Sequence, residues 1–108
     1  MKRAQSSLRR MPGGTSKPLD WAPHARAAYR ETIARIAADD PAAADLVRER
    51  VERALESIAT YPGLGTPGHR RNERRFAVPK TGHVLHYRIV RGAVRIVLWY
   101  RARQEISR

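Results

Sequence analysis

Residues 61–76 read YPGLGTPGHRRNERRF and separate a long helical pattern from a series of strand patterns. Pro62 and Pro67 are incompatible with the interior of a continuing helix, and the glycines between and after them allow the backbone to turn. Four of the next residues, within 70–75, are arginines. The stretch therefore predicts a built loop between a helical layer and a sheet, followed by a cationic first strand.

Two amphipathic helices are predicted on the N-terminal side of this loop. Apolar residues recur at helical spacing over residues 25–37 and again over residues 44–58. Between them, Asp40 is a favourable N-cap and Pro41 a favourable first helical residue. Because so few residues join the helices, we expect an antiparallel helical hairpin. A short strand is expected before it, at residues 19–22.

Three further strands are predicted after the loop, at residues 75–78, 83–90 and 94–100. Residues 83–90 alternate between two faces, and Arg91-Gly92 suits a two-residue hairpin turn. The order is strand, helix, helix, strand, strand, strand. This order predicts an α+β fold, a small antiparallel β-sheet with the N-terminal α-helical hairpin packed on one face.

The length of 108 residues is that of one small domain, which we expect over residues 18–108, after a flexible basic tail at residues 1–17. No apolar run approaches the roughly 18 residues of a membrane span, and the basic N-terminus lacks the apolar segment of a secretory signal. The absence of cysteine excludes disulfides and thiolate metal sites. We therefore expect a cytoplasmic protein with no membrane partner, metal or cofactor.

The formal charge of +12 is unevenly distributed along the chain. Residues 1–17 carry five basic and no acidic residues (+5), residues 18–61 six and eight (−2), and residues 62–108 eleven and two (+9). Such a bias favours a surface for an acidic protein or a phosphate backbone over a merely solubilising face. The candidate partner-binding residues are the arginines Arg70, Arg71, Arg74, Arg75, Arg95, Arg101 and Arg103.

Neighbouring residues of a strand point to opposite faces, which constrains several candidates. Arg74 and Arg75 cannot both face the same side. His83 and His86 are also expected on opposite faces, which argues against a shared metal site. The aromatic residues Tyr87, Trp99 and Tyr100 suggest a platform for stacking bases, but the last two face oppositely, so we expect one of them in the core.

Four short motifs occur in order between residues 19 and 104. They are Trp21-Ala22-Pro23-His24-Ala25, Asp40-Pro41-Ala42-Ala43-Ala44, the loop from Pro62 to Gly68, and a last strand with Val94, Ile96 and Arg103. In this order and spacing they resemble the RelE/ParE superfamily of toxins from bacterial type II toxin–antitoxin systems, most closely its ParE branch. The resemblance implies the α+β fold described above, a small cognate antitoxin and a cellular target.

The two branches imply different activities: ParE-like toxins are taken to inhibit DNA gyrase, whereas RelE-like toxins cleave messenger RNA in the ribosome. RNA cleavage without a metal needs proton carriers and cations around the phosphate. The candidates for these roles are Arg88, Arg101, Arg103, His86 and Tyr100. His86 suits a general base only if arginines flank it. RelE-like chains typically have an arginine near the start of the penultimate strand, where this sequence has Val84.

These observations favour a ParE-like toxin that blocks replication by inhibiting DNA gyrase without catalysis of its own. A cognate antitoxin would neutralise it, through an acidic segment that folds into a groove near the sheet edge or across the helices. Carboxylates of that segment would pair with Arg70, Arg71, Arg74 or Arg75. The alternatives are a RelE-like, ribosome-dependent mRNA endoribonuclease and a module that contacts nucleic acid directly through its basic face.

Overall fold

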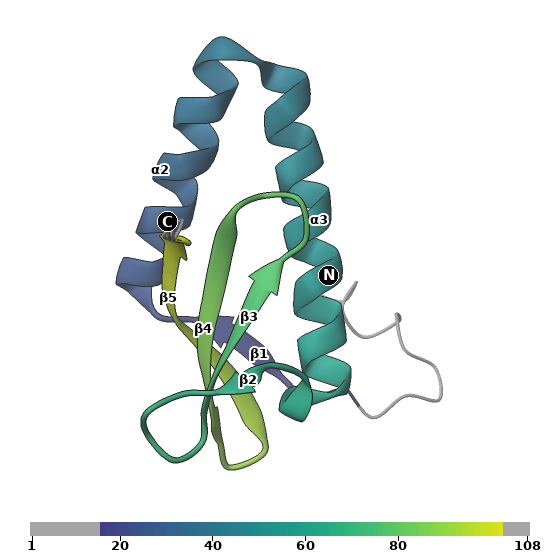
Figure 1. Cartoon of the computed structure of the whole chain (residues 1–108), viewed down its shortest axis with the longest axis vertical. Helices are drawn as coiled ribbons and strands as arrows, with labels where there is room; N and C mark the ends of the chain where they lie inside the picture. Colours follow the sequence, from purple (N-terminus) through teal and green to yellow (C-terminus); the bar gives the residue numbers. More distant parts are fainter. Residues whose placement is uncertain (1–15, 103–108) are drawn as a thin grey trace, which may run out of the picture.

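The computed structural model describes residues 16–102, whose elements confirm the predicted α+β order (Figure 1). The expected tail, residues 1–17, lies outside the described residues except for its last two, and the Lys17 N–H donates to the Ala59 carbonyl oxygen at 2.8 Å. In chain order the elements are β1 (Leu19–Trp21), α2 (Pro23–Asp39), α3 (Pro41–Thr60), the 3-10 helix η1 (Pro62–Leu64), β2 (Thr66–Pro67), β3 (Glu73–Val78), β4 (His83–Val90) and β5 (Ala93–Arg101).

The five strands form one mixed sheet in the order β1-β5-β4-β3-β2. The meander β3-β4-β5 is antiparallel, as predicted, but β1 joins the edge of β5 in parallel, with Leu19 opposite Val94. The two-residue strand β2 was not predicted and pairs antiparallel with β3 through Thr66 and Pro67. Neither pairing can be seen in a local pattern, because alternation shows that a segment is extended but not which strand it joins.

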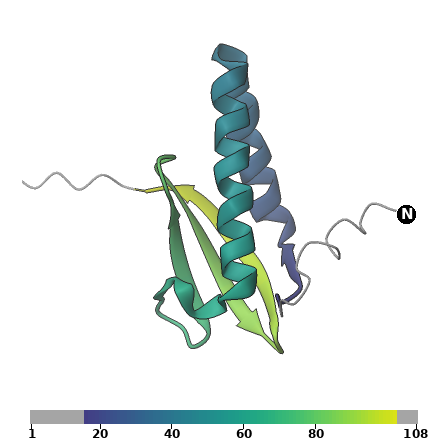
Figure 2. The same cartoon turned by 90° about the vertical axis from the view of Figure 1, so that its right-hand side faces the viewer.

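Both helices cover the same face of the sheet, and no helix of residues 16–102 lies on the opposite face (Figure 2). Asp40 caps α3 as predicted, since its carboxylate accepts a hydrogen bond from the Ala43 N–H at 3.1 Å. The core lies between the helices and the sheet; its largest fully buried side chains are Tyr87, Ile58, Leu85, Ile96, Val51 and Val94. No helix among residues 16–102 has the length and apolarity needed to cross a membrane.

A β-bulge in β5 decides which aromatic residue enters this core. Tyr87 pairs with Ile96 and His86 pairs with Leu98, so β5 uses one residue more than β4 at this point. Beyond the bulge, Trp99 faces the helices and is 5% exposed, while Tyr100 lies on the other side. The expectation that one of these two aromatic residues belongs to the core is confirmed.

Candidate functional site

The face of the sheet opposite the helices, here called the outer face, is the first candidate site. Its residues follow from the strand register, and they form three rows across the sheet. In order from β1 towards β2, the rows are Asp20, Arg95, Arg88 and Glu73; then Leu98, His86, Arg75 and Thr66; then Tyr100, Val84 and Ala77. The sheet thus brings three of the predicted arginines into two adjacent rows.

The first row has two arginines in the middle and a carboxylate at each end. The Arg95 guanidinium donates to the Asp20 carboxylate at 2.9 Å, and Arg88 lies opposite Glu73 in the register. The Arg95–Asp20 pair is largely exposed, so it contributes only about 0–1 kcal/mol to stability. Its main effect is to fix the position of one guanidinium on an otherwise cationic face.

His86 and Glu73 form a partly buried pair in the middle of the outer face. Nε2 of His86 lies 3.3 Å from Oε1 of Glu73, and the two side chains are only 16% and 14% exposed. Burial by itself would raise the pKa of Glu73, but hydrogen bonds with His86 and the Arg70 backbone, with the charges of both residues, leave this pKa below its ordinary value. Arg75 is the register neighbour of His86 on β3 and Leu98 is its neighbour on β5, so one arginine lies beside this imidazole in the register.

The predicted ribonuclease set is divided by the fold. The ring of Tyr100 lies on the outer face, 6.4 Å from that of His86 between centroids. Arg101 pairs in register with His83, whose ring stacks on Trp99 on the helix side of the sheet. Arg103 lies outside the described residues. The structure therefore groups His86, Tyr100 and Arg88 on one face and sets Arg101 on the other side.

Arg74 is separated from Arg75, as alternation predicts. It lies on the helix side opposite Tyr87, and its guanidinium donates to the carbonyl oxygens of Gly65 at 2.6 Å and Gly63 at 3.2 Å. Arg75 is exposed on the outer face. Arg74 is therefore engaged in holding the loop after α3.

Tyr87 is the second anchor of that loop, a role that sequence reasoning missed. Its side chain is 0% exposed, and its hydroxyl donates to the Pro62 carbonyl oxygen at 2.7 Å and accepts from the Gly65 N–H at 3.0 Å. The burial of Tyr87 and Trp99 removes them from the suggested stacking platform and leaves Tyr100 exposed. The signal that could have indicated the anchor is the Pro-Gly-Leu-Gly run, which needs partners for its backbone groups.

The two neighbouring histidines lie on opposite faces, as predicted. His83 is 8% exposed and stacks on Trp99, with ring centroids 4.7 Å apart and an angle of 5° between the planes. Burial lowers the pKa of His83; the Arg101 charge also lowers it, and a hydrogen bond to the Thr81 backbone acts in the opposite direction. Among residues 16–102, no three histidine or carboxylate side chains gather closely enough to hold a metal ion.

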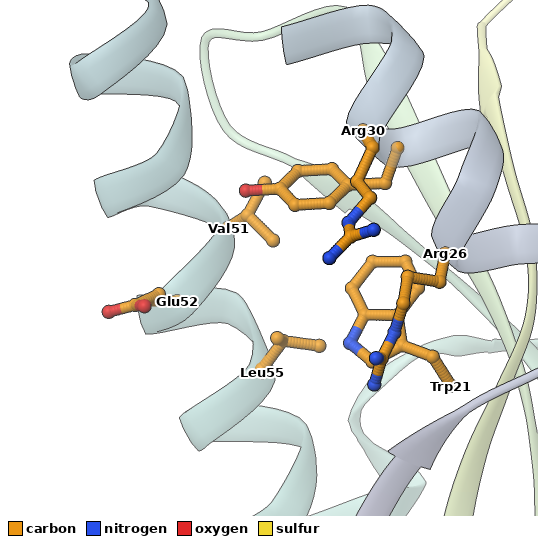
Figure 3. A pocket seen from close by; sticks show the side chains of 7 residues that line it. Trp21, Arg26, Arg30, Val51, Glu52 and Leu55 are labelled. Atoms are coloured by element: carbon orange, nitrogen blue, oxygen red, sulfur yellow. The ribbon is translucent and has the colours of Figure 1, made fainter.

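A groove beside α2 is the second candidate site (Figure 3). Its central pocket, of about 260 Å³, has an apolar floor of Trp21, Tyr29, Val51 and Leu55. Arg26 and Arg30 extend from α2 towards the Trp21 ring, and Glu52 stands on α3 (Figure 3). Adjoining pockets of about 340 and 350 Å³ share Arg30 and continue towards Pro23 in one direction and towards Ala37 and Arg48 in the other.

This groove, the α2 groove, was not among the predicted sites. Arg26 and Arg30 are isolated charges on a predicted helix, and such charges carry little information about a site. The available signal was Trp21 next to a helix whose apolar stripe contains Tyr29. Trp21 and Tyr29 stack with their ring centroids 5.1 Å apart, and both stay partly exposed. Partly exposed aromatic residues of this kind are typical of a binding surface.

The fold is shared with toxins of two related kinds. A chain of the chromosomal ParDE toxin–antitoxin system of P. aeruginosa superposes with a TM-score of 0.71 at 14% identity, covering 82% of this chain and 98% of that one. The isolated RelE toxin of E. coli gives a TM-score of 0.64 at 15% identity, covering 83% and 88%. The chain therefore has the same fold as these two proteins.

Sequence comparison identifies the family to which the chain belongs. Residues 19–104 match the family described as the ParE toxin of the type II toxin–antitoxin system parDE. Y4kP of Sinorhizobium fredii, a candidate toxin by name, is 33% identical over 75 residues, which are 69% of this chain and 78% of that protein. The chain belongs to the ParE toxin family, as its four motifs indicated.

Proposed function

We propose that this protein acts in the bacterial cytoplasm as a ParE-like toxin that inhibits DNA gyrase by binding it and is neutralised by a cognate antitoxin. The observation that supports a binding mechanism without catalysis is that the candidate catalytic residues lie on two different faces of the sheet. Arg101 lies on the helix side beside His83, while His86 and Tyr100 lie on the outer face. Catalysis that uses Arg101 together with His86 or Tyr100 would need these groups around one phosphate, whereas binding does not.

The test is a DNA supercoiling assay with purified gyrase and increasing amounts of the toxin. We expect inhibition that depends on toxin concentration and that weakens at least tenfold when Arg75 and Arg88 are both replaced by alanine. The matched control is Arg35→Ala with Arg53→Ala, which removes the same charge from the helices. Absence of inhibition by the wild-type chain over a wide concentration range would contradict the gyrase proposal.

The antitoxin is proposed to bind in the α2 groove as an acidic amphipathic helix. The groove follows α2 from Pro23 to Ala37, which is about 21 Å at 1.5 Å per residue and long enough for about four helical turns. Its floor is apolar, and Arg26, Arg30 and Arg48 lie along it, so a partner with one apolar and one acidic face is complementary. Pairing with Arg70, Arg71 and Arg75 stays a prediction for a second contact.

Co-expression with the antitoxin encoded beside the toxin tests this surface. Charge reversal by Arg26→Glu with Arg30→Glu is expected to leave the toxin harmful but no longer neutralised. The control is Arg53→Glu with Arg35→Glu, which changes the net charge equally outside the central pocket. Full neutralisation of the first variant would show that the antitoxin binds elsewhere.

A ribosome-dependent endoribonuclease is the second candidate, and the Glu73–His86 pair favours it. With Nε2 facing Glu73, Nδ1 of His86 is free to take the proton of an RNA 2′-hydroxyl. That oxygen would attack the adjacent phosphorus and form a 2′,3′-cyclic phosphate, while the bond from phosphorus to the 5′-oxygen breaks and the 5′-oxygen takes a proton from the Tyr100 hydroxyl or from water. Arg75 and Arg88 would hold the phosphate charge.

Pulse-labelling of DNA and protein synthesis, within minutes of inducing the toxin alone, separates the two candidates. Gyrase inhibition predicts that DNA synthesis stops first. Endonuclease activity predicts that protein synthesis stops first, and that ribosome-bound messenger is cleaved by the wild type but not by His86→Ala. Cleavage that survives His86→Ala would exclude His86 as the base.

A further inference from the structure

Five arginines lie at one end of the sheet, three in two loops that are distant in sequence and two on the strands beside them. Arg70 and Arg71 lie in the β2–β3 loop, Arg91 in the β4–β5 turn, and Arg88 and Arg95 on the adjoining ends of β4 and β5. Both loops are found at the lower end of the molecule in Figure 1. All five side chains are exposed. This group is called the arginine end below.

Backbone hydrogen bonds fix the β2–β3 loop, and one of them joins it to β4 shortly before the β4–β5 turn, so the loop arginines have a defined support. The Ile89 N–H donates to the Asn72 carbonyl oxygen at 2.9 Å, which joins the β2–β3 loop to β4. Within that loop the Glu73 N–H donates to the Arg70 carbonyl oxygen at 3.1 Å. Because the β2–β3 loop is already ordered, less conformational entropy is lost when a ligand binds across both loops.

The charge of the arginine end is only partly compensated within the described residues. The nearby carboxylates are Asp20 and Glu73; the first pairs with Arg95, and the second contacts His86 and the backbone of Arg70. Five guanidinium groups against two carboxylates leave a local excess of positive charge. A polyanion is the complementary ligand.

The hairpin turn itself carries a cation, Arg91. Arg91 and Gly92 have φ angles of 51° and 77°, the left-handed conformations of a tight hairpin turn. Asparagine, aspartate or glycine adopts such a conformation more readily than arginine, for which it costs on the order of 1 kcal/mol. Backbone strain that persists at a residue whose charge lies at the tip of a loop suggests that this charge takes part in binding.

We infer that the arginine end binds the sugar-phosphate backbone of duplex DNA without reading base sequence. Guanidinium groups bind phosphate oxygens through paired hydrogen bonds, and backbone contacts of this kind are indifferent to sequence. A duplex fits better than a single strand because, in the part of the chain described, the exposed aromatic of the outer face, Tyr100, lies at the opposite end of the sheet. This inference goes beyond gyrase inhibition, because it requires no second protein.

The test is fluorescence anisotropy of a labelled 20-base-pair duplex with the full chain over a range of KCl concentrations. Each phosphate contact contributes about −0.9 to the slope of log K against log salt, so three contacts predict about a 40-fold loss of affinity between 50 and 200 mM. Arg91→Asn keeps the hairpin turn, and it should make the slope shallower by about 0.9 without lowering the melting temperature. The double variant Arg70→Ala with Arg71→Ala should make the slope of log K against log salt shallower by about 1.8.

The matched control is Arg53→Asn, which removes one charge from α3. The basic residues at positions 1–17 are present in every variant, so the comparison isolates the arginine end. Equal slopes for Arg91→Asn and Arg53→Asn would overturn the inference, as would tighter binding of a single strand of equal length. These outcomes are independent of the supercoiling assay, so failure of either proposal is recognised separately.

Discussion

The Tyr87 hydroxyl accepts a hydrogen bond from the Gly65 N–H at 3.0 Å, and thereby joins the middle of β4 to the loop that follows α3. The same oxygen donates to Pro62 at 2.7 Å. Tyr87→Phe keeps the ring but leaves both backbone groups without this partner. Because leaving buried polar groups unsatisfied costs about 1–3 kcal/mol, we expect the free energy of unfolding in urea to fall by that amount. Tyr100→Phe, on the exposed face, should change it by less than about 0.5 kcal/mol.

Gly65 is needed for space rather than for an unusual backbone conformation. A Cβ at this position would lie 2.5 Å from the Arg75 carbonyl oxygen and 2.9 Å from the Tyr87 hydroxyl, and the φ angle of Gly65 is an ordinary −75°. We expect Gly65→Ala to lower the free energy of unfolding by about 1–3 kcal/mol. Gly63→Ala is the control: nothing lies within 4 Å, so its stability should be unchanged or slightly higher. Equal losses in both variants would contradict this explanation.

Local signals in the sequence predicted the elements well, because their causes are local. The Asp40 cap, the start of α3 at Pro41 and the alternation over residues 83–90 are all found in the structure. The glycines of the loop were expected to supply backbone freedom, yet positive φ angles among glycines from residue 16 to 102 occur at Gly82 and Gly92. What the loop needs from Gly65 is close approach to β3, which depends on tertiary packing and leaves no local signature.

The candidate site was predicted only in composition. The excess of basic residues in the C-terminal third predicted a cationic surface. The face of the sheet on which each arginine lies, however, depends on strand register. Arg74 shares the helix side with Tyr87, and Arg101 pairs with His83, while Arg75 joins the outer face. The α2 groove was missed because it requires β1 beside β5, a parallel pairing that brings Trp21 next to Tyr29.

The Trp99 indole N–H donates to the Thr32 hydroxyl at 2.9 Å and ties β5 to α2. Thr32→Val keeps the shape of the side chain but removes the acceptor. We expect the free energy of unfolding to fall by about 1 kcal/mol and hydrogen exchange of the Trp99 indole proton to accelerate. Thr32→Ser, which retains a hydroxyl, should leave that exchange close to wild type. Unchanged indole exchange in Thr32→Val would show that this hydrogen bond does not protect Trp99.

The buried imidazole of His83 is expected to make the free energy of unfolding depend on pH. Burial against Trp99 lowers the pKa of His83 in the native state, and the charge of Arg101 acts in the same direction. In the unfolded chain the imidazole titrates near its ordinary value of about 6.5, so below that pH the unfolded state binds a proton that the native state resists. The free energy of unfolding should therefore be highest above pH 7 and decrease as the pH falls below about 6.5.

Urea unfolding at pH 7.5 and pH 5.5 checks this dependence. His83→Phe keeps a ring beside Trp99 but cannot titrate, so its stability should change less between the two pH values than that of the wild type. His24→Asn removes an exposed histidine from α2 and should keep the wild-type dependence. The lowered pKa of Glu73 also makes the native state lose stability in acid, but it does so below about pH 4.5, outside this window. A His83→Phe protein that loses as much stability as the wild type would assign the effect to another group.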